Sequence, residues 1–460
     1  MTDPQRLPLV TAPTNRYDSS TVDAKLVNCF AEQGQGRDEY YVYKRPGFAY
    51  RSSVPAGTAR GLYNWNNNLY SIIDGSIYKD GFLMSAALNN AGVYTFAPCL
   101  GATPKLFFKN TTNAYTIDGA GTVTAVTDLN YPATAVPGSV YLNGTTYVFD
   151  AEANIYGSDA AANDPTSWDP LNLIVAQIEP TAGVMLAKQL VYILAMKQFY
   201  TEAFYDAGNA VGSPLSPVQG SKMNYGCVDA RTVKDVGGDL MWVANTGEGT
   251  PCVVLVANLK LEVVSDPRIE RLLEAWDFTT VYSWGARTAG HRFYGLTSTV
   301  SNQTLVFDLT SRLWYIWKAP GGGYLPYAFS APDVDNLNKT VFLHATSGRL
   351  FNLETTTYRD DSSNFQCDIY TPNYDGGTRR DKTLGRLDII GDQVASTLSL
   401  EFSDDDYQTW TAGPAIDLSL GRPSAADLGA FYKRAFHFSH LANTPMRIRA
   451  AELYVEPGVS

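Results

Sequence analysis

The residues that could do chemistry are spread along the sequence and do not form a recognisable catalytic motif. The closest two of the four histidines, His437 and His440, lie three residues apart in a segment whose apolar alternation predicts a strand. A strand sends such a pair to opposite faces, so we expect no metal site there. Glycosidase chemistry needs two facing carboxylates, and the scattered acids indicate no such pair. Nucleophile-elbow, phosphate-loop, dinucleotide and zinc-protease motifs are missing. We therefore expect no catalytic residue, no metal and no cofactor.

One segment does resemble a known local motif. The sequence SDDDYQTW, from Ser403 to Trp410, is similar to the Asp-box of sialidases and related propellers, Ser-x-Asp-x-Gly-x-Thr-Trp. Ser403, Asp405, Thr409 and Trp410 match, and Tyr407 replaces the glycine. In such a turn the Asp and Ser side chains bond backbone amides while the Trp packs beneath. We interpret the segment as a structural hairpin turn.

The cysteines and the N-terminus bear on the compartment. Five cysteines lie far apart without a C-x-x-C pair, which predicts reduced structural thiols. They are Cys29, Cys99, Cys227, Cys252 and Cys367. The first residues lack the basic start and apolar stretch of a signal peptide. No run of 18 apolar residues occurs, so we expect no membrane insertion and folding in a cytoplasm.

Composition favours an all-β chain with little affinity for nucleic acid. The 460 residues are 45% hydrophobic but only 18% charged, with 38 Gly, 24 Pro, 29 Tyr and 20 Phe. Aromatic residues suit pleated sheets, and Gly and Pro supply turns. The net charge of −11 leaves no basic face of the kind that phosphate binding requires. If DNA is a partner, we expect it to pass by as a polymer and not to be gripped by the protein.

Between about residues 60 and 355 one pattern recurs. A short aromatic or β-branched run is followed by a turn and a second run, as at Asp74-Gly75 and Asn143-Gly144. Asn-Gly and Asp-Gly are strong hairpin signals because both residues tolerate positive φ. The units repeat roughly every 36 to 54 residues, close to the spacing of propeller blades. We predict an irregular β-propeller of six or seven blades; a large sandwich of short strands is the alternative.

The pattern changes at three places. A helix is predicted from Ser265 to Trp276, because capping residues and an early proline precede an apolar stripe. After Asn364 the strands lengthen. We expect residues 1–50 to form an extended arm that packs on the platform, 51–364 the propeller, and 365–460 a C-terminal β-sandwich-like platform domain.

An ordered set of segments resembles the packaged-DNA stabilisation proteins of short-tailed bacteriophages, also called tail hub or nozzle proteins. Their opening pattern, Asn-x-aromatic-x-Glu followed by Arg/Thr-Pro-Gly, matches Asn28, Glu32, Arg45, Pro46 and Gly47. Further matching segments are 156–159, 164–168, 201–208, 225–227, 265–276, 290–294 and 304–314. The resemblance covers roughly residues 26 to 317, and the last 95 residues fit more loosely.

This resemblance implies a structural virion protein of the tail, assembled in the host cytoplasm. Such proteins are arranged, usually as homo-hexamers, beneath the portal and a tail adaptor ring, with a tail needle or tip and tailspikes or fibres as other partners. They retain packaged DNA and permit its ejection. An acidic chain fits this role, because a negative lumen repels double-stranded DNA and does not bind it. The five opening-pattern residues are candidate assembly contacts, although they could equally fix a turn.

Two other functions stay open at this point. A glycan-binding or glycan-cleaving β-propeller is suggested by the Asp-box-like segment and the aromatic content. A receptor-binding fibre head is less compatible with the sequence, since the long repetitive shaft of trimeric fibres is missing.

Overall fold

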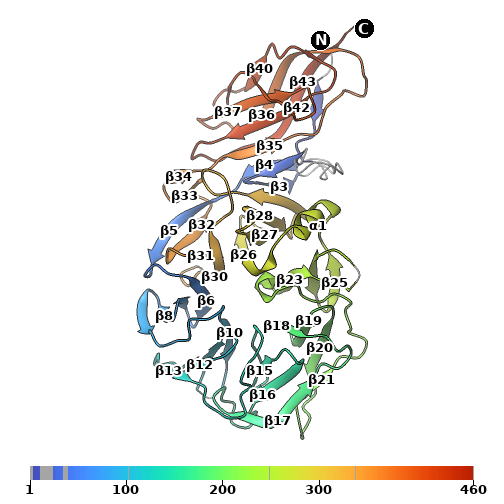
Figure 1. Cartoon of the computed structure of the whole chain (residues 1–460). Coiled ribbons are helices and arrows are strands. Elements are labelled where there is room, and N and C mark those ends of the chain that lie inside the picture. The colour runs from blue at the N-terminus through green and yellow to red at the C-terminus, as the bar shows by residue number, and fades with distance from the viewer. Residues whose placement is uncertain are drawn as a thin grey trace.

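Six separate four-stranded antiparallel sheets form the blades of a β-propeller. The structure, a computed structural model, describes residues 4–10, 24–34, 40–101, 103–247, 249–336 and 338–458. Figure 1 shows the blades arranged around a centre, with both chain termini together at the opposite end of the molecule. The first three blades are β6 (Ala59–Trp65) to β9 (Phe82–Ser85), with β7 (Asn68–Ile73) and β8 (Ser76–Lys79); β10 (Thr95–Cys99), β11 (Lys105–Lys109), β12 (Ala114–Ile117) and β13 (Val123–Ala125); and β14 (Val140–Leu142), β15 (Thr145–Phe149), β16 (Asn154–Ser158) and β17 (Trp168–Val175).

The other three separate blades follow the same order along the chain, except that the last takes its outer strand from the N-terminal region. They are β18 (Gly183–Gln189), β19 (Tyr192–Lys197), β20 (Thr201–Asp206) and β21 (Leu215–Pro217); β22 (Lys234–Val236), β23 (Asp239–Ala244), β24 (Cys252–Ala257) and β25 (Lys260–Val263); and β30 (Tyr327–Pro332), β31 (Thr340–His344), β32 (Arg349–Glu354) and β5 (Gly47–Ser53).

A further group of four strands occupies the remaining position of the propeller. These are β26 (Val281–Thr288), β27 (His291–Ser298), β28 (Gln303–Asp308) and β29 (Leu313–Trp317). Strand β26 contacts β22 on one side and β30 on the other, and β30 in turn contacts β6 of the first blade. The expected range of six or seven blades is therefore confirmed: six are separate sheets, and the four strands from β26 to β29 belong to a larger, ten-stranded sheet.

Local turn chemistry explains why the strands fold into hairpins. Asn66, Asn67, Asp74 and Asn143 all have φ between 46° and 56°, in the left-handed region that Asn and Asp tolerate best among residues with a side chain. Each stands between two strands of a blade, where the backbone must reverse. The two-residue connections keep successive strands adjacent in the sheet, which is the order seen in every blade but the last.

Blade strands are apolar on both faces because each blade packs against two neighbours. In β23, Leu240 and Trp242 pack toward the β18–β21 blade, whereas Met241 and Val243 pack toward β26–β29. This alternation follows from the two-residue period of a strand. Similar apolar clusters fill the other interfaces between neighbouring blades, so the hydrophobic core is a set of layers and has no single centre.

The ten-stranded sheet carries the propeller directly into the C-terminal region. Beyond β29 it continues through β2 (Lys25–Val27), β35 (Cys367–Tyr370), β42 (Ala435–His440), β37 (Thr397–Ser403) and β38 (Thr411–Ala412), with β39 (Ile416–Asp417) also on β37. Strand β2 pairs with β29 in parallel and with β35 in antiparallel fashion. A short strand near the N-terminus therefore joins the propeller sheet to the C-terminal sheet.

A seven-stranded sheet packs on this extension. It contains β3 (Cys29–Gln33), β4 (Tyr40–Lys44), β43 (Arg447–Pro457), β36 (Lys382–Gly391), β40 (Ser424–Ala426), β1 (Gln5–Leu7) and β41 (Ala430–Phe431). One apolar cluster joins both sheets to the adjoining blades, with Phe30, Trp317, Leu387 and Phe438 among its members. A two-stranded sheet, β33 (Arg359–Asp360) and β34 (Ser363–Asn364), lies at the junction.

Helical structure is limited to short elements. The helix α1 (Pro267–Glu274) lies inside the range expected from the sequence, and Asp266 caps it by accepting hydrogen bonds from Arg268 N and Ile269 N. Two 3₁₀ turns, η1 (Ala230–Thr232) and η2 (Phe278–Thr280), complete the described helices. The all-β fold class is thus confirmed.

The closure of the last blade by β5 gives a prediction. Phe48, fully buried in β5, packs against Tyr327 and Phe342, whereas Tyr50 of the same strand is 49% exposed. We expect Phe48→Ala to lower the free energy of unfolding by about 3–5 kcal/mol, because it leaves a cavity at the closure. Chemical denaturation measures this. Tyr50→Ala is the control and should cost clearly less; equal costs would contradict a closure that depends on buried packing in β5.

Candidate functional site

The junction between the propeller and the C-terminal sheets is organised by Arg45, whose side chain is completely buried. Its guanidinium makes a bidentate ion pair with Asp360, at 2.9 Å from Nη1 to Oδ1 and 2.6 Å from Nη2 to Oδ2. Nη1 also donates to the Pro46 carbonyl and Nη2 to the Lys318 carbonyl, both at 3.0 Å. With Nε bonded to Asn28, all five N–H donors are satisfied.

Asn28 extends this arrangement, and we call Asn28, Arg45 and Asp360 the Arg45 joint. Asn28 has a φ of 55° and stands between β2 and β3. Its Oδ1 accepts from Arg45 Nε at 2.9 Å and from the Lys318 amide at 2.7 Å, while Nδ2 donates to the Gln366 carbonyl at 2.7 Å. One side chain thus joins the N-terminal strands, the end of β29 and the start of β35.

The other opening-pattern residues have different surroundings. Gly47 lies so close to β33 that a Cβ there would stand 2.1 Å from the Arg359 carbonyl oxygen, so only glycine fits. Pro46 is buried and contributes its carbonyl to Arg45, whereas Glu32 is exposed on β3. Of the five candidate assembly contacts, the structure therefore brings four together inside the chain and leaves Glu32 at the surface.

Sequence reasoning did not find Asp360 as the partner of Arg45. The two residues are 315 positions apart, and Asp360 stands next to Asp361 in a polar segment of the kind that is usually exposed to solvent. The aromatic ring of Phe365, whose centre lies 3.7 Å from the guanidinium carbon, was missed as well. No local signal marks such pairing, since it is created only when the last blade and the C-terminal sheet meet.

Lys44 and two cysteines lie beside the Arg45 joint. Burial lowers the pKa of Lys44 to about 8, and its Nζ donates to the Ala442 carbonyl at 2.8 Å. The Sγ atoms of Cys29 and Cys367 are 2.7 Å apart, both thiols are buried, and burial raises the pKa of Cys29 well above its ordinary value. All five cysteines are free thiols in the structure.

The Asp-box-like segment forms a tight turn between β37 and β38. Asp405 accepts from Ser403 Oγ at 2.8 Å, from the Thr409 amide at 2.9 Å and from Thr409 Oγ1 at 2.5 Å. These bonds, led by those from Thr409, lower the pKa of Asp405 to about 2. Trp410 packs edge-on against Tyr370, and Tyr407 donates its hydroxyl proton to the Thr371 carbonyl. The polar groups of this turn are thus engaged within the chain.

His437 is held between two carboxylates on the same sheet. Nδ1 lies 2.8 Å from Glu401 Oε2 and Nε2 lies 2.9 Å from Asp368 Oδ1, while Tyr370 stacks on the ring at 4.0 Å. Burial alone lowers the pKa of His437, but the hydrogen bonds and charges of Asp368 and Glu401 outweigh it, so the pKa is raised. The arrangement stabilises an imidazolium inside the sheet.

Within the ranges that the structure describes, no group of three or more His, Cys, Asp or Glu side chains is placed to hold a metal ion. None of the described helices is long and apolar enough to span a bilayer.

The chain matches one protein-family model along most of its length. That model, of a phage stabilisation family described as Bacteriophage P22 Gp10, β-propeller, aligns with residues 5–358. No curated protein sequence matches significantly.

Some solved structures are similar to the chain at low identity. PorZ, a surface component of the type-IX secretion system of Porphyromonas gingivalis, is 11% identical with a TM-score of 0.38; the match covers 79% of this chain and 46% of PorZ. The designed protein Ika8 is 11% identical with a TM-score of 0.40, over 67% of this chain and 99% of Ika8. BamB from Moraxella catarrhalis is 10% identical with a TM-score of 0.38, over 76% and 96% of the two chains.

The Arg45 joint predicts a large cost for removing one charge. We expect Arg45→Met to lower the free energy of unfolding by about 3–5 kcal/mol, because Asp360 would stay buried without a counter-ion. Arg45→Met combined with Asp360→Leu should recover part of this loss. As a control, Arg349→Met removes an exposed partner of Asp361 and should cost about 1 kcal/mol or less. Denaturant titration measures the free energy of unfolding of each variant. Equal losses for Arg45→Met and Arg349→Met would contradict the inference that the Arg45 joint stabilises the chain.

His437 predicts a pH-dependent stability. Because its pKa is raised in the folded chain, the stabilisation is complete below the unfolded pKa of about 6.5 and is lost as the pH rises through the folded value. The stability difference between the parent chain and His437→Gln should therefore be larger at about pH 6 than at about pH 9. His344, whose pKa is lowered by burial and by Arg349, provides a control through His344→Asn, with the opposite pH trend. Urea titrations at both pH values measure these stability differences. A difference between the parent chain and His437→Gln that does not change with pH would contradict the prediction.

Proposed function

Because the chain belongs to the bacteriophage P22 Gp10 β-propeller family of phage stabilisation proteins, we propose that it is the hub or nozzle of a short phage tail. It is a structural phage protein, and in this proposal it works without catalysis. Six copies form an assembly ring that continues the DNA channel below the portal and adaptor, retains the packaged genome and lets it leave on infection.

The observation that carries this proposal is the continuous sheet that connects the propeller with the C-terminal region. The ten-stranded sheet runs through both parts, and the buried Arg45 joint fixes the corner where the N-terminal strands, the last blade and β35 meet. A hub has to transmit contacts from the adaptor to the distal tip without bending. A continuous sheet and a fully paired buried arginine supply that stiffness without any bound ligand.

Charge supports the same role. Each copy carries a net charge of −11, so an assembly ring is strongly negative and repels the DNA phosphates. A basic lining would instead hold the genome through many additive phosphate contacts and slow its exit. Double-stranded DNA is then a partner that passes without specific binding.

The two ends of the molecule suggest how it is oriented. The N-terminal strands β1 to β4 and the C-terminal strands β36 to β43 lie at one end of the molecule, and the blades from β10 to β21 lie at the other (Figure 1). We place the terminal end against the tail adaptor ring and the propeller toward the needle or tip and the tailspikes or fibres. Exposed Glu32 on β3 is then a candidate contact with the adaptor.

The glycan-acting alternative depends on the Asp-box-like turn. Asp405 and Thr409 bond to each other there, and Trp410 packs on Tyr370, so these side chains serve the turn. Binding on a glycan array, or release of sugar from host polysaccharide, would favour that alternative over the hub.

The hub proposal predicts a defect in DNA retention. Particles assembled without this chain should package genome and then lose it, because nothing closes the channel below the adaptor. Nuclease-sensitive DNA in purified particles measures the loss, and adding back the purified chain should restore retention. Negative-stain images of that chain should show rings. Particles that lack the chain but keep their DNA and stay infectious would refute the proposal.

A further inference from the structure

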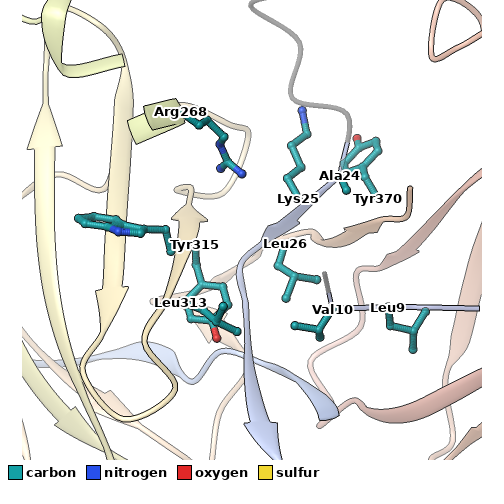
Figure 2. A pocket seen from close by; sticks show the side chains of 10 residues that line it. Leu9, Val10, Ala24, Lys25, Leu26, Arg268, Leu313, Tyr315 and Tyr370 are labelled. Carbon is teal, nitrogen blue, oxygen red and sulfur yellow. The ribbon is translucent and has the colours of Figure 1, made fainter. Parts of the chain in front are cut away.

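A small pocket lies at the junction between the propeller and the C-terminal sheets. It is bordered by helix α1 and by strands β2, β29 and β35, and its cavity volume is about 30 Å³. Leu26, Leu313 and Tyr370 supply apolar lining, Lys25 and Arg268 supply charged lining, and Figure 2 shows the Arg268 side chain reaching from α1 into the pocket. The pocket therefore combines apolar side chains with two cationic ones, Lys25 and Arg268.

Arg268 is 7% exposed, and its guanidinium has no hydrogen-bond or ion-pair partner among the described residues. Its Nε is buried and without an acceptor. The nearest acid in sequence, Asp266, uses one carboxylate oxygen to cap α1 through the amides of Arg268 and Ile269. Burial lowers the pKa of Arg268, and the charge of Asp266 offsets this only in part.

This isolation is unusual within the chain. Among the described residues, the other two buried arginines each have a bidentate carboxylate: Arg45 pairs with Asp360, and Arg434 pairs with Asp404 through two bonds of 2.7 Å. A buried charge without a counter-ion is costly, and native chains retain one mainly where a partner completes it. Among the described residues, the Arg268 guanidinium therefore has no anion to pair with.

We propose that this pocket receives an Asp or Glu side chain from a second copy of the same chain, so that Arg268 anchors the contact between neighbouring copies. The inference rests on the proposed assembly ring. Each copy has 46 acidic and 35 basic residues, so neighbouring copies repel one another unless a cation of one meets a carboxylate of the next. Arg268 supplies such a cation where water is already largely excluded.

The walls of the pocket define the chemistry of the incoming segment. Leu26 and Leu313 would contact apolar neighbours of the acidic side chain, and the planar guanidinium offers the two-pronged geometry that a carboxylate accepts. Arginine in a desolvated pocket is also a residue type that contributes strongly to protein interfaces.

The test compares assembly by two charge-removing variants. Arg268→Met keeps the apolar stem but removes the guanidinium, and Arg379→Met removes one exposed positive charge elsewhere. Native mass spectrometry and sedimentation over a concentration series measure association of each full chain. We expect Arg268→Met to weaken association about tenfold or more and Arg379→Met to leave it nearly unchanged. Arg268→Lys should restore part of the association.

Thermal unfolding of the dilute, unassembled chain separates this role from an internal one. If a neighbour supplies the carboxylate, Arg268→Met should unfold at the same or a higher temperature than the parent, because it removes an uncompensated buried charge. A lower unfolding temperature with unchanged association would show that the chain itself supplies the anion, and the inference would be wrong. It would also be wrong if both variants assembled like the parent. A parent chain that never assembles would instead contradict the proposed assembly ring.

Discussion

The arrangement of this molecule depends on one buried ion pair, between Arg45 and Asp360. A guanidinium can be taken out of water only when every donor finds an acceptor, and here the acceptors come from segments hundreds of residues apart. Meeting that condition brings the N-terminal strands, the closing blade and the C-terminal sheets to one point. Asn28 completes the set and links the same corner to β35.

Around this corner the chain uses sheet continuity in place of a flexible linker. Strand β2 pairs with the propeller on one side and with β35 on the other, so one continuous sheet joins the C-terminal region to the propeller. The apolar cluster that includes Trp317 and Phe438 is shared by both regions. Such a body suits a task of shape and assembly. His437 and Asp405, whose pKa values are perturbed, form hydrogen bonds within the chain. Among the described residues, no group of His, Cys, Asp or Glu side chains is placed to hold a metal ion.

The fold could be predicted from the sequence because its signals are local. Asn143 and Asp74 mark turns through their tolerance of positive φ, and the apolar runs in β23 and β24 indicate strands that are covered on both faces. The capping residue Asp266 and the proline that follows it predict the helix α1. The blade count was predicted only as a range, because four strands belong to a sheet that continues beyond the propeller.

By itself the sequence determined the all-β propeller class, the net negative charge and the resemblance to the family. These depend on composition, on the two-residue period of strands and on turn chemistry, which act over a few residues. Only the tertiary structure decided which charges would be paired. In the folded chain Asp360 pairs with Arg45 and Asp404 pairs with Arg434, whereas Arg268 has no carboxylate partner among the described residues. Ion pairing depends on distances in space and on exclusion of water, and neither is encoded in local spacing.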